Sequence, residues 1–502
     1  MIRTLATSSA IVLVLLAGTA GADVTPEEVW ESWQAMSTAA GQELTVGGSA
    51  RNGDTLEVTG ITLTFKDELG GSAVATWDKL SFKDNGDGTV AVTMPDSFPL
   101  TLAFPAEGEG PGSIALTVTQ PGMTITAGGS ATETSYEFVA PVAALTLNEV
   151  KEKTGAVLET QGNIALSEVA AKYLVVRSET STSIDTSFSA KALAVNVEGK
   201  DAAGSGQGKI VLSLADLNGT TKGNLLGADI MANMALALNS GFTMDTSFTF
   251  GGMSADFDIL DATGPTKLTA SATGGGFVLA LNKDRMNYGT SLTGANIVAS
   301  GPEIPFPQVQ FGFGELGFNI LMPVSKSDAP QDFAFLTKLV DFTVSEDIWG
   351  MFDPAGTLSH EPATIIIDTK GTGFWKQDIM DPSIDLDTIE APGELSSLDL
   401  TLVQAKAAGA DVSATGGLTF DNADLMTFQG VPRPDGKITF NIKGVNALID
   451  NLVSMGLLPE EEVMGFRMML GMFARPGAGP DELVSEVEFK DGGLFANGQQ
   501  LQ

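Results

Sequence analysis

His360 is the only histidine of the chain, and cysteine is absent. A Ser-His-Asp hydrolase needs a histidine as its base, so His360 would have to fill that role. The nucleophile motif G-x-S-x-G does not occur in the sequence. His360 stands between turn-forming residues, which favours an exposed or capped loop position. A zinc site is excluded because the further His or Cys ligands that it needs are missing.

Two other segments have the residue types of ligand sites but not the spacing. In the glycine-rich run Gly204 to Lys209, Ala203 takes the place of the first glycine of a phosphate-binding loop and Ile210 that of the Mg²⁺-binding hydroxyl. We expect a hairpin or flexible loop there.

The second segment is acidic and spans residues 378–394. Its carboxylates suit calcium, but they do not follow the EF-hand pattern, so we expect a solvated loop and leave calcium open. The residues are Asp378, Asp381, Asp385, Asp387 and Glu390. No pair of acids stands out for glycoside hydrolysis, and the sequence predicts no metal or cofactor.

A methionine-rich helix is the best indication of binding. Pro459 and three following glutamates are typical of a helix start, and the helix predicted from 459 to 473 has little polar surface. Methionine adapts to apolar ligands of varied shape, although it also fills ordinary cores. We therefore expect a deeply covered helix with a candidate ligand-binding set of Phe466, Met468, Met469, Met472 and Phe473.

The N-terminus predicts export. Arg3 precedes an apolar core from Ala10 to Ala17, and Ala20-Gly21-Ala22 is a typical cleavage site, so residues 1–22 form a secretory signal cleaved after Ala22. We expect a periplasmic protein without a transmembrane helix. The net charge of −35 argues against nucleic-acid binding.

The elements that position these residues are mostly strands. Apolar residues alternate with Ser, Thr and Asp along much of the chain, as in antiparallel strands that have one buried face and one solvent-exposed face. The sequence predicts a mainly β (α+β) protein: a large, twisted and curved antiparallel sheet with a few helices covering its apolar face.

Two regions are expected, and they share this sheet. The first, 23–300, opens with a helix over Val24–Gln42 and is β-rich. The second, 301–502, follows a proline-rich break at 301–307 and carries helices near 332–345, 446–455 and 459–473.

One stretch resembles a known family. The run Ile348 to Pro354, IWGMFDP, is followed by Glu361-Pro362-Ala363, and both are similar to the bacterial periplasmic family called domain of unknown function 2125. The residues that carry the motif are Trp349, Asp353, Pro354, Glu361 and Pro362. The resemblance covers most of the chain after the signal. It implies an exported envelope protein of Gram-negative bacteria and brings no catalytic residues.

Four functions remain after these exclusions. The first is a non-catalytic envelope protein that holds a lipid or an apolar protein segment in a trough between sheet and helices. The second is a structural or assembly factor without a ligand. A secreted hydrolase and an outer-membrane barrel are less favoured, the barrel because Trp and Tyr are few and the 459–473 helix has no place in it. The oligomeric state stays open.

Overall fold

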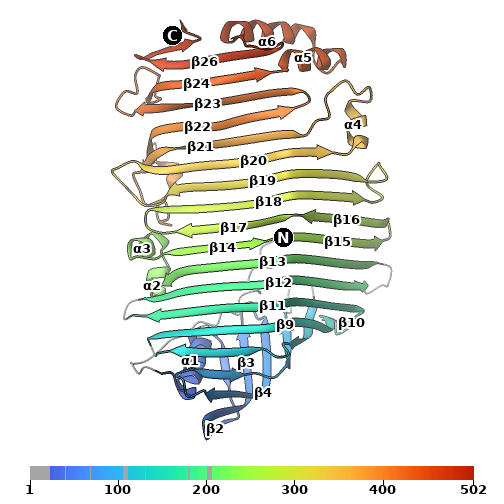
Figure 1. The fold of residues 1–502 in the computed structure, drawn as a ribbon, viewed down its shortest axis with the longest axis vertical. Coiled ribbons are helices and arrows are strands. Elements are labelled where there is room, and N and C mark those ends of the chain that lie inside the picture. Colours follow the sequence, from blue (N-terminus) through green and yellow to red (C-terminus); the bar gives the residue numbers. More distant parts are fainter. Residues whose placement is uncertain are drawn as a thin grey trace. The chain divides into compact units, whose positions relative to one another are not determined.

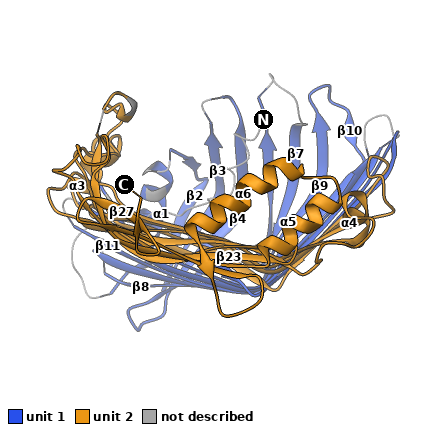
Figure 2. Cartoon of the chain, turned by 90° about the horizontal axis from the view of Figure 1, so that it is seen from above, with its two compact units in different colours: residues 1–226, 248–267 blue, residues 227–247, 268–502 orange. Residues whose placement is uncertain are grey.

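The computed structural model describes residues 23–501 except 40, 68, 106–110, 131, 179–180, 201–205 and 390. The predicted signal sequence, 1–22, lies outside the described residues. The chain forms two compact units (Figure 2). Unit 1 is Met1–Leu226 with Phe248–Lys267, and unit 2 is Gly227–Ser247 with Leu268–Gln502. The proline-rich segment 301–307 therefore does not divide the units.

The prediction of a mainly β, antiparallel fold with few helices is confirmed (Figure 1). Unit 1 contains α1 (Pro26–Ala39), β1 (Glu43–Thr45), β2 (Gly48–Asn52), β3 (Thr55–Lys66), β4 (Ser72–Asp84), β5 (Val90–Thr93), β6 (Ser97–Ala103), β7 (Pro111–Thr119), β8 (Thr124–Gly129), β9 (Glu133–Glu152), β10 (Val157–Leu158), β11 (Thr160–Arg177), β12 (Thr182–Lys200), β13 (Gln207–Leu225) and β15 (Gly252–Asp261). The chain passes between the units after Leu226, within β14 (Met244–Phe250) and within β16 (Gly264–Ala272).

Unit 2 is a meander that runs in chain order from β17 to β24 and then to β26. Its elements are α2 (Ala228–Met231), α3 (Met234–Asn239), β17 (Gly274–Leu281), β18 (Arg285–Ser300), β19 (Val309–Pro323), β20 (Gln331–Val344), α4 (Glu346–Phe352), β21 (Ala363–Trp375), a 3-10 turn (Leu386–Thr388), β22 (Gly393–Ala407), β23 (Ala410–Asp421), β24 (Arg433–Lys443), α5 (Val445–Ser454), α6 (Glu460–Phe473), β25 (Arg475–Pro476), β26 (Glu482–Lys490), β27 (Gly493–Ala496) and β28 (Gln499–Gln500).

Helix α1 confirms the helix predicted at the start of the first region. Thr25 and Glu28 cap it reciprocally: the backbone N–H of Thr25 donates to the Glu28 carboxylate at 2.8 Å, and that of Glu28 donates to the Thr25 hydroxyl at 3.3 Å. Its apolar side packs on the sheet of unit 1, where the rings of Trp30 and Trp33 lie 5.6 and 5.4 Å from that of Phe82. The core of unit 1 therefore sits beneath α1.

The helix predicted near 332–345 is wrong, because this segment is strand β20. Its apolar residues fit helical spacing only because they lie on both faces of a strand. Both neighbours, β19 and β21, pair with β20 along its length, and this pairing decides the structure. A short helix, α4, follows instead. The helices predicted at 446–455 and 459–473 are confirmed as α5 and α6.

Candidate functional site

One face of the unit 2 sheet is apolar across nine neighbouring strands. Directly paired residues of antiparallel strands point to the same side, so the registers define the face. One line of pairs reads Phe277, Thr290, Phe318, Thr337, Ile367, Val403, Ala414, Phe440 and Ser485. The next line on the same face reads Leu292, Leu316, Leu339, Ile365, Ala405, Val412, Ile442 and Leu483. We call these residues, with Tyr288, Ile320 and Phe335 beside them, the apolar face of unit 2.

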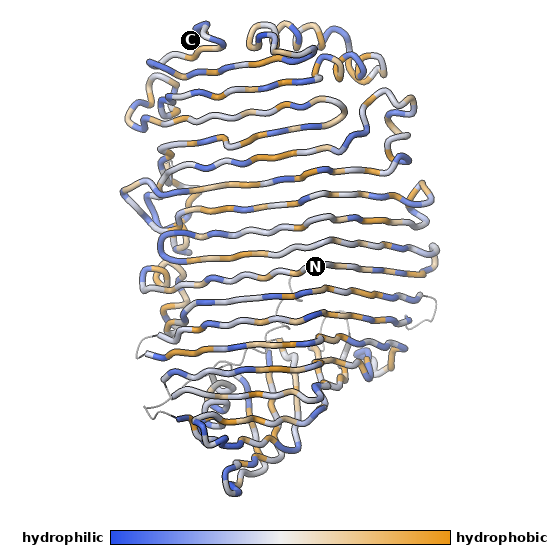
Figure 3. Tube along the Cα trace, in the orientation of Figure 1, coloured by the Kyte–Doolittle hydropathy of each residue, from blue (hydrophilic) through white to orange (hydrophobic). Residues whose placement is uncertain are grey.

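The opposite face of the same strands is polar and charged. Ion pairs join neighbouring strands there: Lys338 Nζ to Glu315 Oε1 at 2.5 Å, Lys437 Nζ to Glu486 Oε2 at 3.2 Å and Lys443 Nζ to Glu482 Oε1 at 3.2 Å. The two kinds of residue alternate along the strands in Figure 3. The unit 2 sheet is therefore amphipathic, with its charges kept on one side.

Side chains of the apolar face stay in contact with solvent. Ile365 is 50% exposed and Ile367 37%, although the β-branched side chains of both suit a sheet core. The ring of Phe318 contacts those of Tyr288 and Phe335, with centroids 6.1 and 5.8 Å apart, yet none of the three residues is fully buried. An apolar surface of this extent, left open, is typical of a ligand or partner site.

Helix α5 covers part of the apolar face. It contacts β23, where Ala410 and Ala414 are buried, and its own Ile449 is buried as well. Figure 2 shows α5 and α6 on the inner side of the bend in the unit 2 strands, so the apolar face is the concave one. The Arg467 guanidinium of α6 donates to Asp450 of α5 at 2.5 Å and holds the two helices together.

The expectation that α6 is deeply covered is wrong. Phe466, Met468, Met469 and Met472 are exposed, Phe473 is half-buried, and only Val463 of the helix is buried. The candidate residues are thus brought together on one helix, but as a solvent-facing surface rather than as the lining of a closed pocket. Its C-terminus is fixed to the sheet, since Ser485 and Asn497 donate to the carbonyl of Phe473.

The motif residues around His360 form a compact loop after α4. The rings of Trp349 and His360 stack with centroids 4.2 Å apart and planes within 9°. His360 Nδ1 lies 3.0 Å from Glu346 Oε2, and its Nε2 lies 3.5 Å from Asp353 Oδ2. His360 is thereby held between an aromatic ring and two carboxylates, so the ring serves to fix the loop.

Asp353 organises the turn that this loop makes. Its side chain is inaccessible to solvent and accepts hydrogen bonds from the backbone N–H groups of Thr357 at 2.9 Å and Leu358 at 2.7 Å. Burial acts to raise the pKa of Asp353, but the two backbone donors and His360 outweigh it and leave the pKa lowered. A carboxylate engaged in this way is a turn anchor.

The rest of the motif joins the loop to other elements. Pro354 directly follows Asp353 at the turn, and Pro362 precedes β21. Glu361 lies 3.9 Å from Lys406 of β22. Asn451 of α5 donates from its side chain to the Thr357 carbonyl at 3.2 Å, which connects the loop to the helix that covers the apolar face.

These motif residues fall within a family match. Residues 258–501 match the family described as uncharacterized protein conserved in bacteria, DUF2125. We call residues 258–501 the DUF2125 region. The match spans the motif and the helix pair, and it covers less of the chain than the resemblance implied. No curated protein matches the chain, and no solved structure does.

No helix of the described residues is both long and apolar enough to cross a membrane. The described residues also contain no group of three or more His, Asp or Glu side chains arranged to hold a metal ion.

The two loop segments weighed for ligand chemistry show turn contacts. In the acidic loop of the DUF2125 region, Asp378 accepts from the Lys326 backbone N–H at 2.7 Å, and Asp381 accepts from the Ser383 N–H and hydroxyl at 2.9 and 2.8 Å. Glu390 lies outside the described residues.

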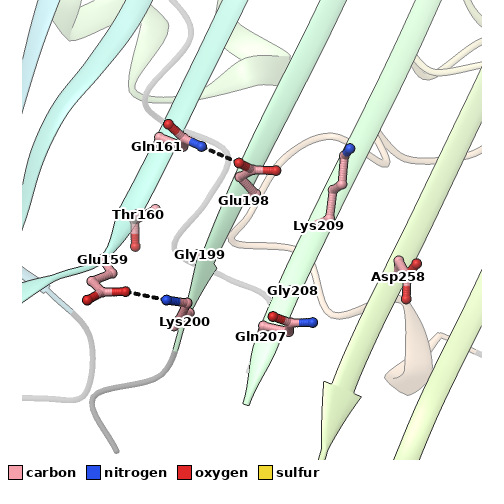
Figure 4. A pocket seen from close by; sticks show the side chains of 10 residues that line it. All are labelled: Glu159, Thr160, Gln161, Glu198, Gly199, Lys200, Gln207, Gly208, Lys209 and Asp258. Atoms are coloured by element: carbon pink, nitrogen blue, oxygen red, sulfur yellow. Dashed lines mark hydrogen bonds and ion pairs between the residues drawn. The ribbon is translucent and has the colours of Figure 1, made fainter. Parts of the chain in front are cut away.

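In unit 1, the first part of the glycine-rich run also lies outside the described residues, and Lys209 belongs to β13. Beside it is a surface hollow at the ends of β11, β12, β13 and β15 (Figure 4). Lys200 and Glu159 form an ion pair of 2.6 Å there, and Gln161 contacts Glu198. Its lining mixes both charges and is wholly polar or glycine, which selects no ligand class.

The sequence predicts an apolar face of the sheet, but it does not identify the residues of the apolar face of unit 2 as a site. The alternation of β19 and β24 is visible in the sequence, but the helix predicted near 332–345 covers nearly all of β20 and interrupts the row of strands. Only the registers of successive strands show that Ile367 continues the line of Phe277 and Phe318, and that Ile365 continues the line of Leu316 and Leu339.

Proposed function

We propose that this protein is an exported, non-catalytic envelope protein that holds the acyl chains of a lipid on the apolar face of unit 2. The observation that carries the proposal is the partly exposed row of Phe, Ile, Leu and Val across the strands of the DUF2125 region, opposite a face of cross-strand ion pairs.

Energetics favour an acyl chain as the occupant. Each methylene removed from water stabilises a complex by about 0.8 kcal/mol, without the need for a directional partner. The face offers aliphatic and aromatic side chains in rows and few polar groups, which matches a hydrocarbon better than a polar metabolite. The bend of the strands would let the chains lie along a concave surface.

The exported location rests on the sequence. Arg3, the apolar core from Ala10 to Ala17 and the Ala20-Gly21-Ala22 site have the order of a cleaved secretory signal. A periplasmic protein with an open apolar face would meet lipids that leave or approach the membranes on either side. The membranes on either side of the periplasm would therefore be the source of the proposed lipid ligand.

The non-catalytic part of the proposal rests on how the polar groups are used. His360 is stacked on Trp349 and placed between Glu346 and Asp353, while Asp353 anchors backbone donors. These contacts support a structural role for the motif.

The test places a photo-cross-linking amino acid at single sites of β21. Ile365 and Ile367 lie on the apolar face, whereas Ile366 between them pairs with Lys338 and Gln404 and lies on the polar face. Irradiation in the periplasm followed by mass spectrometry should give lipid adducts at 365 and 367 and none at 366. Equal adducts at all three sites would contradict the proposal.

Native mass spectrometry of the purified chain, followed by organic extraction, gives the independent readout. A reproducible extra mass identified as a phospholipid or fatty acid supports the lipid-holding role. A clean mass with no lipid in the extract, together with no adducts at 365 and 367, favours an assembly factor that presents the same face to a protein segment.

A further inference from the structure

Four polar side chains beneath α1 in unit 1 have shielded atoms that form no hydrogen bond of good geometry with the described residues. They are the Ser32 hydroxyl, the Trp33 indole N–H, the Tyr136 hydroxyl and all three nitrogens of the Arg177 guanidinium. Such groups are rare in folded proteins, because each buried donor left unpaired costs free energy. Ser32 and Trp33 lie close enough to the Tyr136 phenol to act as its hydrogen-bond partners, so these three side chains can partly satisfy one another, whereas the Arg177 guanidinium has no such partner among the described residues.

The four side chains converge from three elements. Ser32 and Trp33 come from α1, Tyr136 from β9 and Arg177 from the end of β11. Ser32 and Trp33 are each 9% exposed and Tyr136 2%, and the Tyr136 phenol interacts with Ser32, Trp33 and Arg177. The group is thus one cluster, which we call the α1 donor cluster.

The charge of the cluster is positive at neutral pH. Burial raises the pKa of Tyr136 to about 12, so the phenol keeps its proton. Burial lowers the pKa of Arg177 to about 10, so the guanidinium keeps its charge. Every member can therefore donate hydrogen bonds.

No described carboxylate forms an ion pair with Arg177. Arg51, Arg433 and Arg467 each pair with an acid, at 2.7, 2.9 and 2.5 Å. The chain carries 62 acidic residues against 27 basic ones, so acids are not scarce. A shielded guanidinium without a counter-charge is strongly destabilising, and in this chain the described residues do not supply that charge.

We propose that the α1 donor cluster binds one small carboxylate anion, such as acetate or formate. The planar fork of Arg177 matches the two oxygens of a carboxylate, and the Tyr136, Trp33 and Ser32 donors complete its coordination. A water molecule would satisfy the donors but would leave the charge of Arg177 uncompensated. This site lies in unit 1 and is independent of the proposed lipid-holding face of unit 2.

The test titrates sodium acetate against the purified protein and compares it with sodium isethionate at equal ionic strength. Isethionate is a bulkier sulfonate, so it controls for screening. Acetate should raise the melting temperature saturably, by a few degrees at about 100 times its dissociation constant, and should change the fluorescence of Trp33. An equal response to isethionate, or no response to either salt, would overturn the proposal.

Substitutions locate the effect. Arg177→Gln should abolish the acetate-dependent shift, and Tyr136→Phe should weaken acetate binding about fivefold by removing one donor. Arg51→Gln is the matched control, because Arg51 is an arginine of the same unit whose partner is Glu27. It should keep the full shift. A shift that persists in Arg177→Gln would overturn the assignment.

A variant that fails to fold leaves the proposal testable. Ion chromatography of the supernatant after denaturing extensively desalted wild-type protein should detect close to one carboxylate per chain in protein prepared with acetate. A stoichiometry near zero, with no acetate-dependent shift in the titration, would contradict the site.

Discussion

Both units carry an antiparallel sheet with apolar side chains, but a helix seals the part of unit 1 beneath α1, while much of the apolar face of unit 2 stays open. In unit 1, α1 lies over the sheet, and Phe82 beneath it is completely buried. In unit 2, α5 covers the region around β23, and Ile365 stays half-exposed. The two sheets therefore differ in which strands a helix covers, and less in the apolar character of the strands themselves. An unsealed apolar face does little for stability and is therefore available for binding.

The largest expected effect comes from truncating the sealed core. Phe82→Ala removes a ring that contacts Trp30 and Trp33 and should destabilise unit 1 by about 3–5 kcal/mol. Phe318→Ala on the open face should cost about 1 kcal/mol or less, because its ring already meets solvent. Hydrogen exchange under increasing urea would measure each unit separately. Equal losses would show that the unit 2 face is a core after all.

The second effect is on ligand retention. The double change Ile365→Ser and Ile367→Ser should reduce co-purified lipid about tenfold, while stability changes by about 1 kcal/mol or less. Ile366→Ser on the charged face is the matched control and should retain lipid. Lipid content by extraction and mass spectrometry checks this. If the control loses lipid equally, the proposed face is wrong.

The sequence predicts helix α1, which covers the core of unit 1, better than it predicts the solvent exposure of the apolar face of unit 2. Thr25, Pro26 and Glu28 specify the start of α1 locally, and the Trp30–Trp33 spacing identifies its buried side. The open face depends on pairing between distant strands, and a residue such as Ile367 gives no sign of what lies above it. Apolar residues on both faces of β20 also imitated a helix, and only β19 and β21 resolve that ambiguity.

The candidate site was predictable in part for the same reason. The methionine-rich helix α6 was found from its composition, but its exposure depends on the absence of a layer above it. The α1 donor cluster gave no signal, because Tyr136 and Arg177 lie 41 positions apart and meet only when β9 pairs with β11.

The third effect is a pH dependence of the loop around Asp353, which follows α4 and contacts α5. The lowered pKa of Asp353 means that the folded state prefers the carboxylate, so its stabilisation is complete above the ordinary value of 3.8 and disappears as pH falls through the lower folded value. The protection factors of the Thr357 and Leu358 amides against hydrogen exchange should fall about tenfold over that range.

Substitution separates this carboxylate from its neighbours. In Asp353→Asn, the same two amides should have low protection factors at every pH, since the side chain loses its charge and one of the two oxygens that accept their hydrogen bonds. Asp347→Asn on α4 is the control and should leave the exchange unchanged. An unaltered profile in Asp353→Asn would mean that the turn does not depend on the Asp353 charge.

The smallest effect tests the exposed surface of α6 against the sealed core. Met468→Gln with Met472→Gln should change the stability of unit 2 by about 0.5 kcal/mol or less, because both side chains are mostly in solvent. In dilute peroxide, Met468 and Met472 should form sulfoxide before Met94 and Met123, which pack against the core beneath α1. Peptide mass spectrometry gives the order. Protection of Met468 and Met472 in protein carrying lipid, and its loss after delipidation, would extend the binding surface from the sheet to α6; oxidation at the same rate in both states would confine it to the strands.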